Sequence, residues 1–308
     1  MQKKILIIAA AVTLLLALTA GLFLYRESQN PESQTAPEPT ATSAPTVIPT
    51  ETPEPTANPE SSFTAYFFDV GEADCSLVEC DGEYMLIDGG NAGSSDFLFS
   101  YLKQNGIEHL KYIVCTHAHA DHAGGLAGAL NYAEVDTAFA PVEDYDNRAF
   151  ESFKKYLGEQ GKSITIPTPG DTARLGSATI TFLAPLSESE NPNNTSIILR
   201  IEYGDTSFLF TGDAERDEEI ELLRSGRTVR STLLKVGHHG SDTSSCLPFV
   251  TAVDAQYAII SVGEGNEYGH PNEEVLQRLS KSTIYRTDIN GDIVCHSNGT
   301  TLSFETEH

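Results

Sequence analysis

The chain is poor in basic residues. Its 308 residues include 19 Lys and Arg against 44 Asp and Glu, which gives a formal net charge of −25. A protein that grips long nucleic acid through its surface is usually basic, because counterion release supplies much of the affinity. The composition therefore argues against a broad nucleic-acid-binding surface, except where bound metal ions reverse the field locally. An acidic surface also keeps a domain soluble.

Cysteine is scarce and odd in number, so no disulfide framework is predicted. The five cysteines are Cys75, Cys80, Cys115, Cys246 and Cys295. Cys115 lies inside an apolar run and should be a buried thiol. Cys75 and Cys80 are an odd number of residues apart on one predicted strand, so they should point to opposite faces of the sheet.

The first 26 residues predict a membrane anchor. Residues 5–25 carry no charge and follow Lys3 and Lys4, and their length is about that of a bilayer-spanning helix. Lysines before the span leave the N-terminus in the cytoplasm and the rest of the chain outside the cell. The small-residue cleavage site of a signal peptide is poorly formed here. We expect a single-pass cell-membrane protein with an extracellular domain; cleavage of the segment, giving a secreted protein, is the alternative.

Residues 27–62 lack the large apolar side chains that a packed core needs. They are mostly Pro, Thr, Ala, Ser and Glu, a composition typical of a disordered, extended linker. Residues 63–308 are the length of one domain. The sequence therefore predicts three parts: an anchor over residues 1–26, a linker over 27–62 and a folded domain over 63–308.

Strands and helices alternate in both halves of this domain. Asp81-Gly82 and Gly204-Asp205 separate apolar runs, as hairpin turns do. Helical spacing of apolar residues occurs over residues 96–105, 122–130, 215–223 and 272–279. This order favours an α/β (α+β) fold with two mixed sheets packed face to face and helices outside, rather than one doubly wound sheet.

Four predicted strands end in clusters of polar residues, and functional groups gather at the carboxyl ends of strands in layered folds. The clusters hold six of the nine histidines. They are His117-Ala-His119-Ala-Asp121-His122, Thr211-Gly-Asp213, His238-His239-Gly240 and Tyr268-Gly-His270-Pro271.

The first cluster predicts a metal site. Alternate residues of an extended segment point the same way, so His117 and His119 can face one ion, while Asp121 and His122 can face another nearby. Imidazole and carboxylate ligands suit zinc, iron or manganese. Packing alone offers no reason to crowd four costly polar groups at a buried strand end. Asp213 is a candidate carboxylate bridge between the two ions.

The other three clusters also admit structural interpretations. Asp213 could be an ordinary turn or helix-capping aspartate. His238 and His239 could form a polar strand end, and His270 before Pro271 carries the weakest signal. For the isolated His109 and His296, the sequence favours no functional role.

The motifs together resemble the metallo-β-lactamase superfamily, whose signature is His-X-His-X-Asp-His. More narrowly, the chain is similar to the extracellular hydrolase domain of ComEC-type competence proteins, which act in bacterial DNA uptake. One predicted anchor stands here in place of their multi-span channel. The landmarks of the resemblance are Phe68-Asp-Val-Gly-Glu-Ala-Asp, Leu86-Ile-Asp-Gly-Gly, Thr116-His-Ala-His-Ala-Asp-His, Phe210-Thr-Gly-Asp, Leu234-Lys-Val-Gly-His-His-Gly-Ser and Tyr268-Gly-His-Pro.

The resemblance implies a four-layer αββα sandwich that holds two divalent metal ions, zinc or manganese. The implied ligands are His117 and His119 for one ion, Asp121 and His122 for the other, Asp213 between them, and His239 or His238 completing the second ion.

It also implies supporting roles. Asp88 would orient a ligand histidine from outside the ligand set, while Asn194 and Lys235 would contact substrate or support the ligands. The superfamily usually supplies a further histidine where this chain has Asn193-Asn194. His270 could contact a phosphate oxygen or protonate the leaving group.

These expectations lead to a function. We expect an extracellular, membrane-anchored metal-dependent hydrolase of phosphoesters, with Asp121, His238 and His270 in catalytic roles. Its substrate would be single-stranded DNA, making it a nuclease, or a small phosphodiester; no obligate protein partner is implied. The alternatives are a surface-displayed binding module with a vestigial metal site, or a hydrolase of another ester or amide class.

Overall fold

The computed structural model describes residues 61–308. The predicted anchor, and the predicted linker up to residue 60, lie outside this part of the chain. Between residues 61 and 308, no helix combines the length and the apolar composition needed to cross a bilayer. The domain predicted from residue 63 onwards is therefore the part whose fold can be followed.

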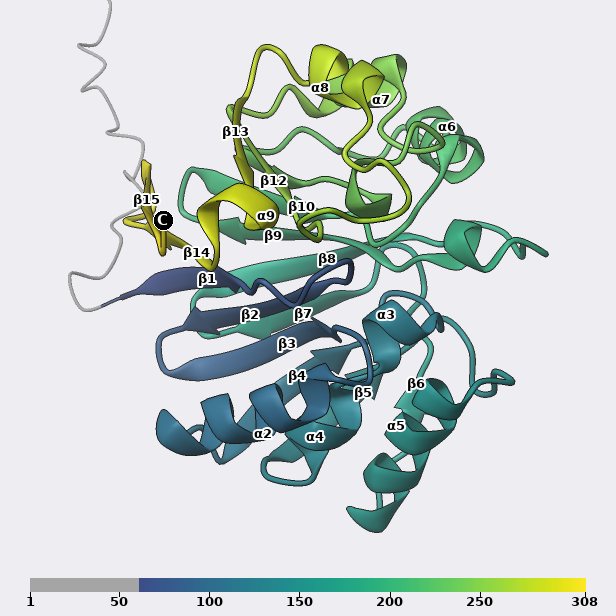
Figure 1. Cartoon of the computed structure of the whole chain (residues 1–308), viewed down its shortest axis with the longest axis vertical. Helices are drawn as coiled ribbons and strands as arrows, with labels where there is room; N and C mark the ends of the chain where they lie inside the picture. Colours follow the sequence, from purple (N-terminus) through teal and green to yellow (C-terminus); the bar gives the residue numbers. More distant parts are fainter. Residues whose placement is uncertain (1–60) are drawn as a thin grey trace, which may run out of the picture. The chain divides into compact units, whose positions relative to one another are not determined.

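Two mixed sheets form the centre of the domain (Figure 1). The first has eight strands, in the order β15 (Leu302–Thr306), β14 (Ile293–Ser297), β1 (Phe63–Phe67), β2 (Cys75–Cys80), β3 (Glu83–Gly89), β4 (His109–Val114), β5 (Glu134–Phe139) and β6 (Ile164–Thr165). The second has seven, in the order β13 (Thr283–Arg286), β12 (Tyr257–Ile260), β11 (Leu233–Lys235), β10 (Thr206–Phe210), β9 (Ile198–Tyr203), β8 (Ala178–Ala184) and β7 (Thr172–Leu175).

Helices cover the outer face of each sheet (Figure 1). Those on the first sheet are α2 (Ser94–Gln104), α4 (Leu126–Leu130) and α5 (Arg148–Glu159). Those on the second are α6 (Arg216–Arg224), α7 (Leu247–Val253) and α8 (Glu273–Arg278). The layers therefore run helix, sheet, sheet, helix, which confirms the predicted two-sheet sandwich.

Alternation along the strands builds this sandwich. In β1, Phe63 and Phe67 enter the core between the sheets, whereas Phe68, just after the strand, packs under the helices of the first sheet. From the second sheet, Phe208 meets Phe63 with ring centroids 4.5 Å apart, and its neighbour Leu209 faces the other helical layer. Each such buried side chain contributes roughly 1.5–3 kcal/mol relative to an exposed one.

The cysteine and hairpin predictions are confirmed. All five cysteines are free and buried, and Cys80 faces the core between the sheets while Cys75 faces the helical layer. The strands β2 and β3 pair antiparallel around Asp81-Gly82, where both residues have positive φ, at 53° and 81°. Such a pair matches the twist of a two-residue hairpin.

The single helix predicted over residues 122–130 is wrong. The chain instead forms α3 (Ala120–Ala123) and α4, with Gly124 and Gly125 between them. A Cβ atom on Gly125 would lie 2.1 Å from the carbonyl oxygen of Gly89. The helix breaks because the glycines let the chain turn directly against the end of β3, a contact that the local apolar pattern does not reveal.

Gly125→Ala should therefore lower the free energy of unfolding by about 2 kcal/mol or more, because backbone must shift to admit the methyl group. Gly158→Ala is the matched control: Gly158 lies in α5 with nothing within 4 Å of its Cβ position, so the change should stabilise by about 0.5–1 kcal/mol. Chemical denaturation measures both. Equal effects of the two substitutions would contradict the close approach.

Candidate metal centre

The four polar clusters meet at one edge of the sandwich. They follow β4 of the first sheet and β10, β11 and β12 of the second, which are consecutive parallel strands. The junction is a close one: Nε2 of His122 lies 3.1 Å from Oδ1 of Asp213. Side chains from both halves of the chain thus share one buried space.

One group of potential metal ligands combines Asp121, His122, Asp213 and His239, whose ligand atoms all lie within 4.8 Å of one another. Oδ2 of Asp121 is 3.2 Å from Nε2 of His239 and 3.8 Å from Nε2 of His122. His239, rather than His238, therefore joins this group.

A second group combines His117, His119 and Asp213. Nε2 of His117 lies 3.0 Å from Nδ1 of His119 and 3.7 Å from Oδ2 of Asp213. Asp213 thus belongs to both groups, with Oδ1 beside His122 and Oδ2 beside His117. One carboxylate faces two sets of imidazoles.

The donor atoms fit a divalent metal ion. His122 Nε2 and Asp213 Oδ1 are buried and find no hydrogen-bond partner within residues 61–308, although they lie only 3.1 Å apart. They are not aligned as donor and acceptor, as expected of two atoms aimed at a common third point. In a tetrahedral site with Zn–N distances of about 2.0–2.1 Å, neighbouring ligand atoms lie roughly 3.4 Å apart, which agrees with the separations of 3.0–3.8 Å observed here.

Asp88 holds His122 from behind. Its Oδ2 lies 2.9 Å from Nδ1 of His122, and its two oxygens accept hydrogen bonds of 2.7 Å from the backbone and side chain of Thr116. A carboxylate on the far nitrogen fixes the tautomer and the ring orientation of a metal-ligating histidine. Asp88 thus lies where a residue that orients this ligand should be.

Lys235 and Asp74 form a buried pair behind His239. The lysine Nζ donates to both carboxylate oxygens of Asp74 at 2.8 and 2.7 Å, and Asp74 Oδ1 is 3.4 Å from Nδ1 of His239. That same nitrogen lies 3.0 Å from the carbonyl oxygen of Ser261. Lys235 is 2% exposed, so the geometry favours support of the ligands over contact with substrate.

Three residues of the candidate site have a strained backbone conformation. Asp88, His238 and His239 have φ of 58°, 52° and 53°, a region that costs side-chain-bearing residues energy and recurs at functional sites. The two histidines turn sharply within one 3-10 segment, η2 (His238–Gly240). As a result His239 points inward while His238 stays half-exposed.

Two of the candidate ligands have pKa values shifted in opposite directions by burial and by neighbouring charges. Burial, helped by the neighbouring His122, lowers the pKa of His117 to about 3. Burial alone would also lower the pKa of His239, but the carboxylates of Asp213, Asp121 and Asp74 outweigh it and raise that pKa to about 10. Without metal, His239 is therefore a cation and His117 is neutral at pH 7.

The other predicted site residues surround the cluster. Nε2 of His238 lies 3.9 Å from Asp213, and the ring centroids of His238 and His270 are 5.9 Å apart. Oδ1 of Asn194 accepts from the backbone N–H of Glu215 at 3.0 Å, at the N-terminus of α6. This carbonyl oxygen is thus already engaged with the residue that precedes α6.

Sequence reasoning missed Glu72 and Asp74. Both lie in the loop between β1 and β2 and face histidines of the site, His270 and His239. A signal was present in the two acidic residues of Gly71-Glu-Ala-Asp beside a strand end. Without the fold, however, nothing connected that loop to His239, 165 positions after Asp74, or to His270, 198 positions after Glu72.

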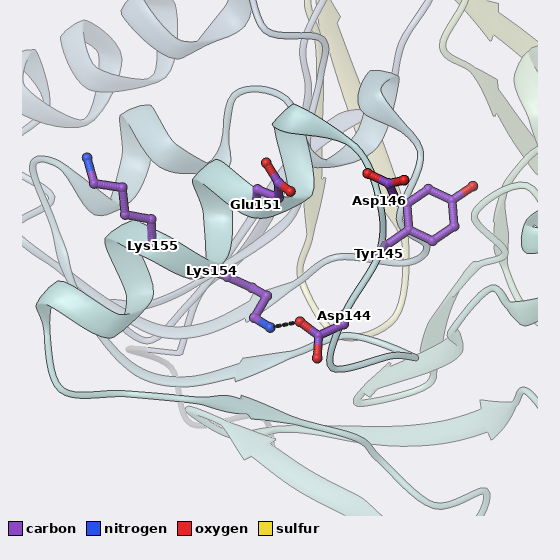
Figure 2. Close-up of a pocket in the computed structure, with 6 residues that line it drawn as sticks. All are labelled: Asp144, Tyr145, Asp146, Glu151, Lys154 and Lys155. Atoms are coloured by element: carbon purple, nitrogen blue, oxygen red, sulfur yellow. Dashed lines mark hydrogen bonds and ion pairs between the residues drawn. The ribbon is translucent and has the colours of Figure 1, made fainter.

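A hollow of about 590 Å³, whose lining residues are drawn in Figure 2, lies near the second group. Tyr145 connects the hollow to the second ligand group, because it lines the hollow and its ring meets that of His119 edge-on, with centroids 6.1 Å apart. Figure 2 shows Lys154 paired with Asp144, so this lysine is not free to attract an anion. The lining residues are Asp144, Tyr145, Asp146, Glu151, Lys154 and Lys155.

Comparison with known families and proteins agrees with this geometry. The profile described as Metallo-beta-lactamase superfamily matches residues 68–264. ComE operon protein 3 of Bacillus subtilis is 33% identical over 201 residues, which cover 64% of this chain and 26% of that protein. Competence protein ComA of Neisseria gonorrhoeae is 29% identical over 238 residues, covering 75% of this chain and 32% of that protein. The resemblance to competence proteins is confirmed, and the chain spans about a quarter to a third of these relatives' length.

Solved structures show the same fold at low identity. The metallo-beta-lactamase fold protein YhfI from Bacillus subtilis has a TM-score of 0.51 at 14% identity, and covers 79% of this chain and 100% of its own. A mutant of the CmlA beta-hydroxylase has a TM-score of 0.50 at 16% identity, covering 77% and 54% respectively. These likenesses show the fold alone, since a shared fold does not decide the reaction.

Metal binding should release protons. An imidazole binds metal only after its proton leaves, and the pKa of about 10 means that His239 holds that proton at pH 7. Affinity for zinc should therefore rise with pH up to about 10. Titration calorimetry in buffers of different ionisation enthalpy should report at least one proton released per chain; binding without proton release would contradict the charged imidazole.

The same shift predicts a stability change in the metal-free protein. The pKa of His239 in the folded protein lies above the ordinary value of 6.5. The charged imidazole therefore adds to the free energy of unfolding fully below pH 6.5, and this stabilisation is lost as pH rises towards 10. Thermal unfolding of metal-free protein should show this loss, and the zinc-loaded protein should not.

Proposed function

The chain belongs to the metallo-beta-lactamase superfamily, and from this premise we propose that it is a metal-dependent hydrolase of phosphoesters. The observation that carries the proposal is the position of Asp213. Its two carboxylate oxygens lie 3.1 Å from His122 and 3.7 Å from His117, members of two separate ligand groups. That arrangement suits two divalent ions bridged by one carboxylate.

The residues divide between the two ions by their contacts. His117 and His119 would hold the first ion. Asp121, His122 and His239 would hold the second. Asp213 would bind both ions, one with each carboxylate oxygen. Two such ions supply charge stabilisation for the oxygens of a phosphoester and lower the pKa of a bound water. Zinc or manganese suits imidazole and carboxylate ligands.

The protein groups around the ligands have their own tasks. Asp88 and the Asp74–Lys235 pair keep His122 and His239 in orientation. His238 is half-exposed beside Asp213, where it can contact a substrate oxygen. With the metal ions bound, these groups would orient the ligands and the substrate beside them.

The substrate class follows from the relatives and the charge. The resemblance to ComEC-type competence proteins, which act in DNA uptake, supports DNA as a substrate, whereas the net charge of −25 disfavours a grip on long duplex. Single-stranded DNA or a small phosphodiester satisfies both observations. The salt dependence of the cleavage rate distinguishes these two substrates. Between roughly 50 and 500 mM salt, the rate should fall steeply for a strand held by many phosphate contacts and should hardly change for a small ester.

We also propose that the domain works outside the cell. The support is the uncharged run over residues 5–25 behind Lys3 and Lys4, followed by a Pro- and Thr-rich stretch that suits a tether. Membership of a hydrolase superfamily is independent of this placement, so the catalytic proposal stands without it.

One observation favours a different function. Asn193 and Asn194 stand where the superfamily usually supplies a histidine, and the carbonyl of Asn194 is engaged with Glu215. A weakened first metal position would suit a binding module with a vestigial site. A hydrolase of another ester or amide class has only the superfamily name in its favour.

Counting metal ions distinguishes enzyme from module. The purified protein, incubated with zinc and dialysed, should hold close to two ions per chain by elemental analysis. Asp213→Ala should hold at most one, since it removes the shared ligand. A wild-type protein that stays metal-free would support the binding module.

Asp121→Ala should lower hydrolysis of bis-p-nitrophenyl phosphate by at least about 100-fold, because the second ion loses a charged ligand and with it several kcal/mol of transition-state stabilisation. Asp96→Ala, an exposed aspartate in the first turn of α2, is the matched control and should retain full activity. Unchanged turnover in Asp121→Ala would remove this residue from the mechanism.

A further inference from the structure

His270 is held rigidly although it belongs to none of the potential ligand groups among residues 61–308. Its backbone N–H donates to Oδ1 of Asn266 at 3.0 Å, and its carbonyl accepts from Nδ2 of the same side chain at 2.7 Å. One ring face stacks on Tyr268, with centroids 5.6 Å apart and planes 19° apart. This much restraint fixes the direction of the imidazole.

Glu72 completes the restraint. Its Oε1 lies 2.7 Å from Nδ1 of His270, and its Oε2 accepts from the backbone N–H of Gly263 at 2.8 Å. The backbone packs closely here as well, since a Cβ atom on Gly263 would lie 2.7 Å from the nitrogen of Glu72. An ionised carboxylate only accepts hydrogen bonds. Nδ1 of His270 is therefore the donor, and Nε2 is the nitrogen left for other work.

The ring of His270 stands beside the metal cluster. Its centroid is 5.9 Å from that of His238 and 6.4 Å from that of His239, and its side chain is only 13% exposed. A group at this distance does not replace a ligand, but it can reach a substrate that the ions hold.

We propose that Glu72 is a positioning residue that makes His270 the general acid for the leaving group. The inference rests on the proposed phosphoester hydrolysis. As the attacking water oxygen bonds to phosphorus and releases a proton to solvent, the bond from phosphorus to the leaving oxygen breaks and its electron pair stays on that oxygen. The proton on Nε2 of His270 moves to this oxygen, so an alcohol departs. His270 is left neutral, still donating from Nδ1 to Glu72, and regains a proton from solvent.

The leaving group provides the test. p-Nitrophenolate departs without a proton, whereas the alkoxide of a nucleoside needs one. In the zinc-loaded full-length protein, His270→Ala should lower kcat for a dinucleoside monophosphate by about 10²–10³-fold. For bis-p-nitrophenyl phosphate the loss should be roughly tenfold smaller. Glu72→Gln keeps the size of the side chain but removes its charge, and should show the same selective loss at about one tenth of the size.

Two comparisons exclude a structural explanation. Glu264→Gln removes the same charge from an exposed position in the same loop as His270 and should change neither reaction. In a His270→Ala background, Glu72→Gln should cause no further loss. Equal losses of Glu72→Gln on both substrates, or an additive loss in the double variant, would overturn the inference and leave Glu72 as a tie between loops.

The tautomer gives a readout that does not depend on activity. In zinc-loaded protein with ¹⁵N-labelled histidine, the His270 resonance, assigned by its absence in His270→Ala, should show a proton on Nδ1 that is lost or shifted in Glu72→Gln. An unprotonated Nδ1 in the wild type would contradict the Glu72 contact. If wild-type protein hydrolyses neither ester, the proposed function fails and the acid role falls with it, while a protonated Nδ1 would still establish the pairing.

Discussion

A buried carboxylate, that of Asp213, joins the two halves of the domain, because imidazoles from both halves lie around it. It is 2% exposed, and burying an ionised group is costly unless charge and hydrogen bonds compensate. The compensation comes from His117 and His122, which follow a strand of the other sheet. Gly212 makes the approach possible, since a Cβ atom there would lie 2.8 Å from Cβ of Thr116.

The charge balance around Asp213 explains why a cation is needed. Asp74, Asp88 and Asp213 are all nearly fully buried, and within residues 61–308 Lys235, beside Asp74, is the only lysine that pairs with any of them. The remaining negative charge requires either protonated imidazoles or metal ions. The carboxylates that raise the pKa of His239 are therefore the same ones that attract a divalent cation, so protons and metal compete for one site.

The acidic composition and the metal site act on substrate in opposite directions. A net charge of −25 repels polyanions at a distance, whereas two divalent ions would attract a phosphate group locally. Under the proposed function, this combination favours substrates that present one phosphodiester at a time. The hollow beside His119, with its paired lysine and excess of acidic residues, adds no general attraction for anions.

Much of the fold could be predicted from sequence because its signals are local. Alternating residues such as Phe67 and Phe68 face different layers, and Asp81-Gly82 turns a hairpin. The break in the helix after His122 could not be predicted, because it results from contact with Gly89 on another strand. Likewise β6 has only two residues, Ile164 and Thr165, too few to show a period.

The sequence by itself identified the candidate metal ligands, because histidines and aspartates at alternate positions after an apolar strand do not contribute to the packing of a hydrophobic core. Only the tertiary structure decided how that set is divided. It placed His239, rather than His238, in the candidate ligand group through two left-handed residues in one turn, engaged Lys235 with Asp74, and brought Glu72 to His270 across 198 residues. Contacts of this kind depend on where separate strands end in space, and no local pattern in the chain records that.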